Sequence, residues 1–339
     1  MAEHKLINAK GQPSYGVFEP PIDTINHMDF DLRNAMDRKL SKFKKKLQFN
    51  QFNFVSLVSQ DLILAVAIVD LKIASNCFIY LYETATNKFE EFSFVQPLSR
   101  KTRIELQPNN GKSYFRKGEN YVKIEANSVA GTRSVNVNLK NGLTIDALID
   151  ESTKYNPLQM CSRAGYSGWV FTQKSAALEC SGMVNWQGQK YNLKDRNTLA
   201  SVDWSAGYMR RETYWNWASL ACTLGDGRRL GLNLAAGVNE TGTSENAFWI
   251  DGEMVKVDMV DFQFDRYQKD HHWIMRSNDG KIDIRFEPEG LRKEKMNMLI
   301  VASNFTQHFG RYFGTIKAGN EIIELDGIWG FVEDHYAKW

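Results

Sequence analysis

The sequence has few of the residues that build metal sites, disulfide frameworks or redox motifs. Its 339 residues include only 4 cysteines and 6 histidines, and no CxxC, HxH or HExxH spacing occurs among them. Structural zinc sites and thiol redox motifs need such spacings, so we expect reduced, buried thiols instead. We therefore expect no metal site and no cofactor.

A large excess of charge of one sign and long apolar runs are also missing. The formal net charge is +2, which provides no field to attract nucleic acid or an anionic membrane. The longest apolar run, Leu62–Val69, is far too short to span a bilayer, and Met1–Ile7 lacks the apolar core of a secretory signal. We expect a cytoplasmic protein with no nucleic-acid partner and no integral membrane segment. The oligomeric state stays open.

Motifs for nucleotides and for activated nucleophiles are absent as well. The glycine-containing stretch Leu224–Gly227 has the composition of a hairpin turn and matches neither a phosphate loop nor a dinucleotide fingerprint. No GxSxG elbow occurs. The remaining candidates for chemistry are carboxylates, aromatic rings and their neighbours.

Short segments with apolar residues at every second position dominate the chain. From Phe49 to Ile149 such segments recur about ten residues apart, and tight turns such as Asn141-Gly142 separate them. The same pattern returns after Trp215. It predicts an all-β protein built as an antiparallel barrel or sandwich. The chain is too long for one ordinary barrel, so we expect two domains.

The N-terminal region has a different pattern. Gly11–Asp29 carries three of the seven prolines and is typical of an extended arm. Within Leu32–Leu47, apolar residues recur every three or four positions, which predicts a short amphipathic helix.

Aromatic and charged residues concentrate in the stretch Asp203–Trp217. Burying such a mixture is costly unless every charge is paired, so selection for stability alone rarely assembles it. Two further polar and aromatic stretches are Gly237–Trp249 and Gly327–Trp339. Loops at one end of a β-barrel converge on its mouth, which predicts that the three stretches form one site.

The candidate residues fall into two groups. The catalytic candidates are the carboxylates Asp203, Glu240 and Glu333. The ligand-binding candidates are polar or aromatic: Trp204, Arg210, Arg211, Glu212, Tyr214, Trp215, Trp217, Asn239, Glu245, Trp249, His335 and Tyr336. A structural role is the alternative for each residue taken singly. Alternation along one strand places Trp215 and Trp217 on one face and Asn216 on the other.

Four segments resemble the domain-of-unknown-function family 2804. They are Arg163–Lys174, Asp203–Trp217, Asn239–Gly242 and Glu333–Tyr336, and the match runs over nearly the whole chain. The family name implies no function.

A more distant resemblance implies a fold. The hairpin Ala177–Tyr191, the short loop Ser201–Trp204 and the Trp-x-Trp strand Trp215–Leu220 are together similar to the lipocalin-like carotenoid 1,2-hydratase, attachment-protein and tocopherol-cyclase-type group. This resemblance implies two lipocalin-like antiparallel β-barrels in tandem. The first covers residues 1–196, including the arm, and the second covers residues 197–339.

The same resemblance implies a role for Asp203. Its position matches that of an Asp thought to protonate an alkene in the hydratase. The hydratase pattern has a Trp before this Asp and a His after it, whereas Val202 and Trp204 flank it here. An arginine in contact with Asp203 would disfavour acid catalysis, because it would lower the pKa of the carboxyl.

Three functions follow as hypotheses. The favoured one is binding of an apolar or amphipathic small molecule, such as a lipid or isoprenoid, near the seam of the two barrels. The alternative is a hydratase, isomerase or cyclase acting on an alkene-containing hydrophobic substrate, with Asp203 as general acid and Glu240, Glu245 or Glu333 assisting. A protein-interaction module with an exposed aromatic patch is the third.

Overall fold

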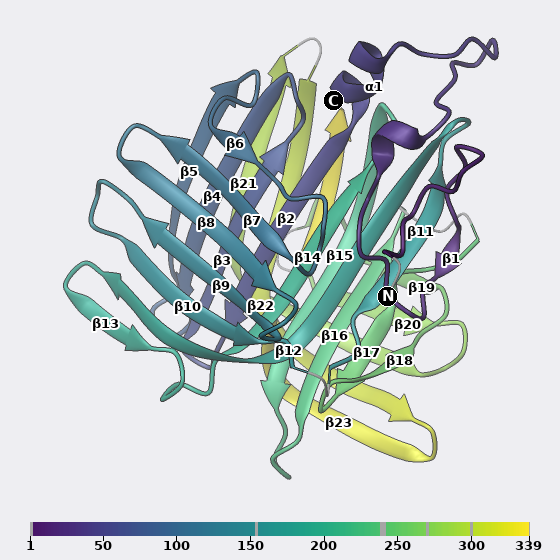
Figure 1. Cartoon of the computed structure of the whole chain (residues 1–339). Coiled ribbons are helices and arrows are strands. Elements are labelled where there is room, and N and C mark those ends of the chain that lie inside the picture. Colours follow the sequence, from purple (N-terminus) through teal and green to yellow (C-terminus); the bar gives the residue numbers. More distant parts are fainter. Residues whose placement is uncertain (1–2, 153–154, 238–241, 269–270, 299–300, 339) are drawn as a thin grey trace.

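The computed structural model describes residues 3–152, 155–237, 242–268, 271–298 and 301–338. Regular structure in these ranges is almost entirely antiparallel β, arranged as two curled half-barrel sheets in tandem, as predicted (Figure 1). No helix in the described ranges is long and apolar enough to cross a membrane.

The first sheet has 14 strands, and its main path runs β5-β4-β3-β2-β14-β12-β10-β9-β8-β7-β6. Its strands are β1 (Gly16–Val17), β2 (Asn50–Val58), β3 (Leu62–Asp70), β4 (Ala74–Glu83), β5 (Lys88–Pro97), β6 (Thr102–Arg103), β7 (Gly111–Lys117), β8 (Asn120–Asn127), β9 (Thr132–Asn138), β10 (Thr144–Asp150), β11 (Leu158–Ala164), β12 (Gly168–Trp186), β13 (Gln189–Asn192) and β14 (Leu199–Gly207). Strands β1 and β11 pair beside β12, and β13 pairs with the far end of β12.

The second sheet has 9 strands in the order β18-β17-β16-β15-β23-β22-β21-β20-β19. Its strands are β15 (Glu212–Thr223), β16 (Arg229–Ala236), β17 (Ala247–Ile250), β18 (Glu253–Lys256), β19 (Val260–Gln263), β20 (Trp273–Ser277), β21 (Ile282–Met298), β22 (Val301–Ala318) and β23 (Glu321–Lys338). The long strands β21, β22 and β23 lie behind β2 to β5 of the first sheet in Figure 1.

Strand β3 shows why the two sheets pack against each other. Its residues Leu62, Leu64, Val66 and Ile68 belong to the core inside the first sheet, while the alternate residues Ile63, Ala65 and Ala67 pack against the second sheet. A strand buried on both faces needs a continuous apolar sequence, which explains the unbroken run there. Each sheet therefore has an apolar interior and an outer face that the other sheet covers.

The chain passes from one sheet to the other between β14 and β15. Strand β14 pairs with β12 and β2 in the first sheet, whereas β15 pairs with β16 and β23 in the second. The predicted second barrel, residues 197–339, includes all of Asp203–Trp217, but the first part of this stretch lies in the first sheet. The reason is long-range pairing, which local composition does not encode. The division at residues 196/197 stays a prediction.

The N-terminal arm covers one end of the first sheet. Its apolar residues Leu6, Ile22, Phe30 and Leu32 join the first core. The 3-10 turn η1 (His27–Asp29) and the helix α1 (Lys42–Gln48) are the helical elements of the described chain, and the Ser41 hydroxyl caps α1 by accepting from the Lys44 amide. The helix is shorter than the apolar spacing indicated.

Candidate functional site

The interface between the two sheets, called the seam here, is rich in aromatic side chains. It joins the outer face of β12, β14, β2, β3 and β4 to that of β16, β15, β23, β22 and β21. Its buried apolar residues are Phe54, Val58, Ile63, Ala65, Ala67, Tyr80, Tyr82, Trp217, Ala235, Phe309, Trp329 and Phe331. Rings stack across it, as in the pair Tyr82 and Phe309, whose centroids lie 4.6 Å apart.

A buried group of three charged residues lies in the seam, and we call it the charge cluster. Lys174 on β12 and Asp203 on β14 are register partners, so their side chains leave the same face of the first sheet. The Lys174 Nζ atom lies 2.6 Å from Asp203 Oδ2 and 3.3 Å from Glu245 Oε1. Glu245 comes from the second sheet, in the segment between β16 and β17. All three residues are at most 8% exposed.

The charge cluster has one ammonium for two carboxylates. Burial raises the pKa of Asp203, Lys174 opposes this, and the nearby charge of Glu245 raises it further, so the net shift is upward. Burial disfavours the charged form of Lys174, but Asp203 and Glu245 outweigh it and raise the pKa of the ammonium. A proton added to the cluster therefore goes to a carboxyl group, and it leaves the cluster neutral.

Neighbouring side chains hold Glu245 in place. Lys256 Nζ donates to the carbonyl oxygens of Ser244 at 2.6 Å and of Asn246 at 2.7 Å, one on each side of Glu245. Asn233 Nδ2 donates to the Glu245 carbonyl at 2.8 Å. Burial lowers the pKa of Lys256 to about 8. The backbone around Glu245 is thus fixed before any ligand arrives.

Trp217 forms the aromatic wall beside the charge cluster. Lys174 Nζ lies 5.5 Å from the centroid of the Trp217 ring, within cation–π range. The indole Nε1 donates to Asn233 Oδ1 at 2.8 Å. The rings of Phe54 and Phe331 contact Trp217 edge to face at 5.4 and 5.1 Å. One side of the cluster is therefore apolar and rigid.

Trp215, on the same face of β15 as Trp217, contacts a carboxylate outside the charge cluster, that of Glu333. Its Nε1 donates to Glu333 Oε1 at 2.8 Å, and its ring lies 4.2 Å from that of His335. The Glu333 carboxylate also accepts from Gln307 Nε2 at 3.4 Å. Asn216 bonds to Asp334 instead, as expected for the opposite face. The predicted alternation of Trp215, Asn216 and Trp217 is confirmed.

Six of the candidate residues thus lie together on the seam: Asp203, Trp215, Trp217, Glu245, Glu333 and His335. Trp204 does not, because it alternates with Asp203 along β14 and packs inside the first sheet against Phe171. Trp249 packs with Leu158 and Ala176 and donates to the Asn156 carbonyl at 2.8 Å.

The remaining candidates lie at the rim or outside the described residues. Glu212 pairs with Lys338 at 2.9 Å, and Tyr214 is 62% exposed. Arg210 and Tyr336 are half-buried near this rim, and Arg211 is exposed. Lys174, not an arginine, contacts Asp203. Asn239 and Glu240 lie outside the described residues.

Sequence reasoning missed several seam residues. Lys174, Asn233, Tyr80, Gln307 and Arg292 are buried there, and none was a candidate. Lys174 did carry a signal, since a lysine inside the otherwise uncharged run Trp169–Leu178 is unusual for a buried strand.

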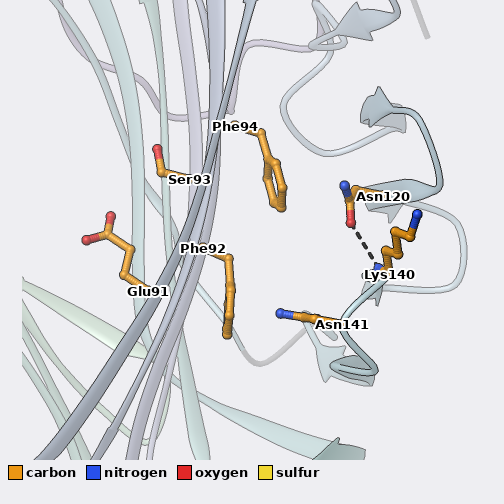
Figure 2. A pocket seen from close by; sticks show the side chains of 7 residues that line it. All are labelled: Glu91, Phe92, Ser93, Phe94, Asn120, Lys140 and Asn141. Atoms are coloured by element: carbon orange, nitrogen blue, oxygen red, sulfur yellow. Dashed lines mark hydrogen bonds between the residues drawn. The ribbon is translucent and has the colours of Figure 1, made fainter.

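An open cavity lies beside the edge strand β5, and one of its lining residues, Glu91, also pairs with Arg292 of the seam. Its volume is about 440 Å³, and its lining residues are Glu91, Phe92, Ser93, Phe94, Asn120, Lys140 and Asn141. Figure 2 shows Phe92 and Phe94 pointing towards Asn120 and Asn141, while Glu91 and Ser93 point the other way. None of the lining residues is buried. A second cavity of about 460 Å³ lies between α1 and Ser167.

Within the described ranges, no group of three His, Cys, Asp or Glu side chains is placed to hold a metal ion. The seam offers paired charges, hydrogen-bonding groups and aromatic faces.

Comparison with known proteins supports the fold. Among curated proteins, none matches the sequence significantly. The structure is similar to that of CghA, over 98% of this chain and 96% of that chain, with a TM-score of 0.58 and 11% identity. It is also similar to kievitone hydratase from Nectria haematococca, over 86% of this chain and 89% of that chain, with a TM-score of 0.54 and 12% identity.

The sequence itself matches one family model over its whole length. The model is described as a domain of unknown function, DUF2804, and the match covers residues 1–339. The tandem-sheet chain with a charge cluster in its seam therefore belongs to the DUF2804 family.

Proposed function

We propose that this protein binds an amphipathic small molecule, such as a lipid or isoprenoid, in the seam between its two sheets. The charge cluster carries this proposal. Two carboxylates and one ammonium, all at most 8% exposed, contribute little to stability compared with apolar residues of the same volume. Their position beside the Trp217 ring provides both a polar contact and an apolar wall for a ligand.

The seam sets the character of the ligand. Its rings, among them Phe54, Trp217 and Phe331, favour a flat or unsaturated apolar body. Lys174 and Asp203 favour a polar group at one end. We expect the ligand to enter by shifting side chains of the seam, and binding selects a more open arrangement of the two sheets.

A second candidate function is acid catalysis by Asp203, and the raised pKa of its carboxyl favours it. A protonated Asp203 would transfer its proton to one carbon of an alkene, and the electron pair of the double bond would form the new C–H bond. The cation left on the other carbon would face the Trp217 ring. Water would add there and return a proton to Asp203, or the Asp203 carboxylate would remove a proton from a neighbouring carbon and the double bond would shift.

Structural relatives are consistent with this class of chemistry. One is named as a hydratase, and CghA has been solved together with Sch210972. Because their sequence identity is low, the likeness shows only the fold. The proposed acid role of Asp203 therefore depends on the charge cluster in this chain. Burial raises the pKa of Asp203 most strongly, Lys174 favours its ionised form and Glu245 opposes it, so these three effects together decide the acid strength.

Native mass spectrometry of the protein purified from its own cells tests the binding proposal. We expect an additional small-molecule mass on the wild-type chain and its loss from the Trp217→Leu variant. Tyr214→Leu is the matched control, because Tyr214 lies on the same strand and is 62% exposed. An adduct that survives in Trp217→Leu, or a wild-type chain with no adduct, would contradict the proposal.

The identified molecule then tests catalysis. Incubated with wild type, a substrate should change by the mass of one water or isomerise, and Asp203→Asn should abolish the change while keeping the adduct. Turnover that persists in Asp203→Asn would remove Asp203 from the acid role.

A further inference from the structure

A second buried polar group lies in the seam, close to the edge strand β5. Arg292 on β21 is buried, and its Nη2 atom donates to Glu91 Oε1 on β5 at 2.6 Å. Three aromatic rings surround the guanidinium: Phe78 at 4.3 Å, Phe305 at 4.5 Å and Tyr80 at 5.2 Å. An arginine held this way is a fixed hydrogen-bond donor inside an aromatic box.

Three polar atoms of this group have no hydrogen-bond partner among the described residues. They are Arg292 Nε, Gln307 Oε1 and the Tyr80 hydroxyl, and all three residues are at most 4% exposed. Buried donors and acceptors of this kind are normally satisfied, and each orphan destabilises the fold. Arg292 and Gln307 are register partners on β21 and β22, so their side chains leave neighbouring points of one face.

The orientation of Gln307 is set by its neighbours. Its Nε2 donates to Glu333 Oε2 at 3.4 Å, so its Oε1 is directed elsewhere. The Tyr80 hydroxyl lies close enough for the amide to influence its pKa, which burial raises, but the geometry falls short of a hydrogen bond. The group thus presents the Arg292 Nε–H donor and the Gln307 carbonyl acceptor, with the Tyr80 hydroxyl beside them.

Local charge decides which chemical group fits. Glu91 already neutralises Arg292, and Glu333 adds a carboxylate nearby, so an anionic group gains little here. A cationic group would be repelled by the guanidinium of Arg292. A neutral hydroxyl can accept from Arg292 Nε and donate to Gln307 Oε1, and it therefore satisfies both atoms at once.

We propose that Arg292 and Gln307 form a subsite for a neutral hydroxyl group on an aromatic or polyunsaturated ligand. Phe78, Tyr80 and Phe305 hold the ring or chain that bears this hydroxyl. The inference rests on the proposed function, since the ligand is the molecule bound in the seam. It adds a chemical class: the ligand is a neutral alcohol or phenol rather than a carboxylic acid.

Three probes of similar shape test the subsite by ligand-observed NMR titration. They are 2-naphthol, which donates and accepts; 2-methoxynaphthalene, which only accepts; and 2-naphthoate, which is anionic. Wild type should bind 2-naphthol about three- to tenfold more tightly than 2-methoxynaphthalene, and 2-naphthoate most weakly. Gln307→Leu should remove this preference, and Arg292→Lys, which keeps the charge but lacks Nε–H, should reduce it.

The control is Asn120→Ala, since Asn120 lines the open cavity beside β5 and not the seam. It should keep the full preference. Circular dichroism establishes whether each variant folds. If Gln307→Leu does not fold, Arg292→Lys alone tests the subsite. Equal wild-type affinities for 2-naphthol and 2-methoxynaphthalene, or a preference that survives both variants, would overturn the subsite. A crystal structure determined with 2-naphthol would also overturn the subsite if it showed only an ordered water between Arg292 Nε and Gln307 Oε1.

Failure of the subsite is distinguishable from failure of the proposed function. Suppose that wild type binds 2-methoxynaphthalene as tightly as 2-naphthol and that Trp217→Leu abolishes this binding. The subsite is then rejected, but the seam remains a ligand site. Absence of binding by all three probes overturns both.

Discussion

The open cavity beside β5 and the buried seam place aromatic rings in opposite settings. In the cavity, Phe92 and Phe94 are half-exposed and face the turn residues Asn120 and Asn141 (Figure 2). In the seam, rings are buried beside paired charges and orphaned hydrogen-bonding atoms. The cavity has a volume that a small ligand would fill, yet it offers little that would orient one.

The comparison shows that an open cavity and a set of fixed polar groups occur in different parts of the molecule. A ligand site needs a few fixed polar groups as well as an apolar lining, and only the seam combines them in buried form. Natural proteins retain buried charges at a cost to stability mainly where they serve a function. If the buried charges of the seam serve a function, changes in the charge cluster should alter stability and ligand affinity strongly, and changes such as Lys140→Ala in the cavity should alter them little.

Lys174→Met should have the largest effect. It removes the ammonium that lies between Asp203 and Glu245, so both buried carboxylates lose their ion pair with Lys174 and the free energy of unfolding should fall by about 3 to 5 kcal/mol. Urea denaturation at neutral pH measures this. Adding Asp203→Asn and Glu245→Gln to the same variant should restore most of the loss. A loss below about 1 kcal/mol would mean that the cluster is hydrated and weakly coupled.

Gly290→Ala should have the next largest effect. A Cβ at this position would overlap the Tyr82 ring on the opposite sheet, so side chains or strands must shift. Overpacking of this kind costs about 1 to 3 kcal/mol, read from the thermal midpoint. Combining it with Tyr82→Leu should cost less than the sum of the two single changes. Simple additivity would show that the sheets do not touch there in solution.

The third prediction concerns the pH dependence of Asp203. Its pKa is raised in the folded chain, so the folded state binds more protons than the unfolded state above the ordinary pKa of an Asp. This contribution to stability is present at low pH and is lost as pH rises through the folded pKa. The unfolding free energy of wild type minus that of Asp203→Asn should therefore decrease as the pH rises above the ordinary pKa of an Asp. An increase over this range would mean that Lys174 dominates and that Asp203 stays ionised.

Lys140→Ala, in the open cavity, should have the smallest effect. Its pair with Glu119 is 3.5 Å long and both side chains are more than 70% exposed, so the change in unfolding free energy should stay below about 0.5 kcal/mol. Ligand affinity should not change either. A measurable loss of affinity would move the binding site from the seam to the cavity.

Sequence patterns predicted the architecture well, because strands with period-two alternation and tight turns leave few other folds. The same alternation placed Trp215 and Trp217 on one face, and composition alone identified Asp203, Glu245 and Glu333 as unusual. These residues come from segments far apart in the chain, and the seam brings them together.

Other parts of the site were beyond prediction from one sequence. Gln307 and Arg292 occupy alternating positions that are typical of a solvated strand face, and their burial depends on the first sheet covering them. The pairing of Lys174 with Asp203 depends on the register of β12 and β14, which is a long-range property. Trp204 was expected at the site because it adjoins Asp203, but adjacent residues on a strand face opposite ways.

Hydrogen–deuterium exchange with and without 2-naphthol tests the central claim most directly. The seam account predicts that the probe slows exchange in β4, β21 and β22, which carry the hydroxyl subsite, and in β15, which carries Trp217, and that Trp217→Leu removes this protection (Figure 1). Protection confined to β5 and the turn between β9 and β10 would place the ligand in the open cavity and contradict the account.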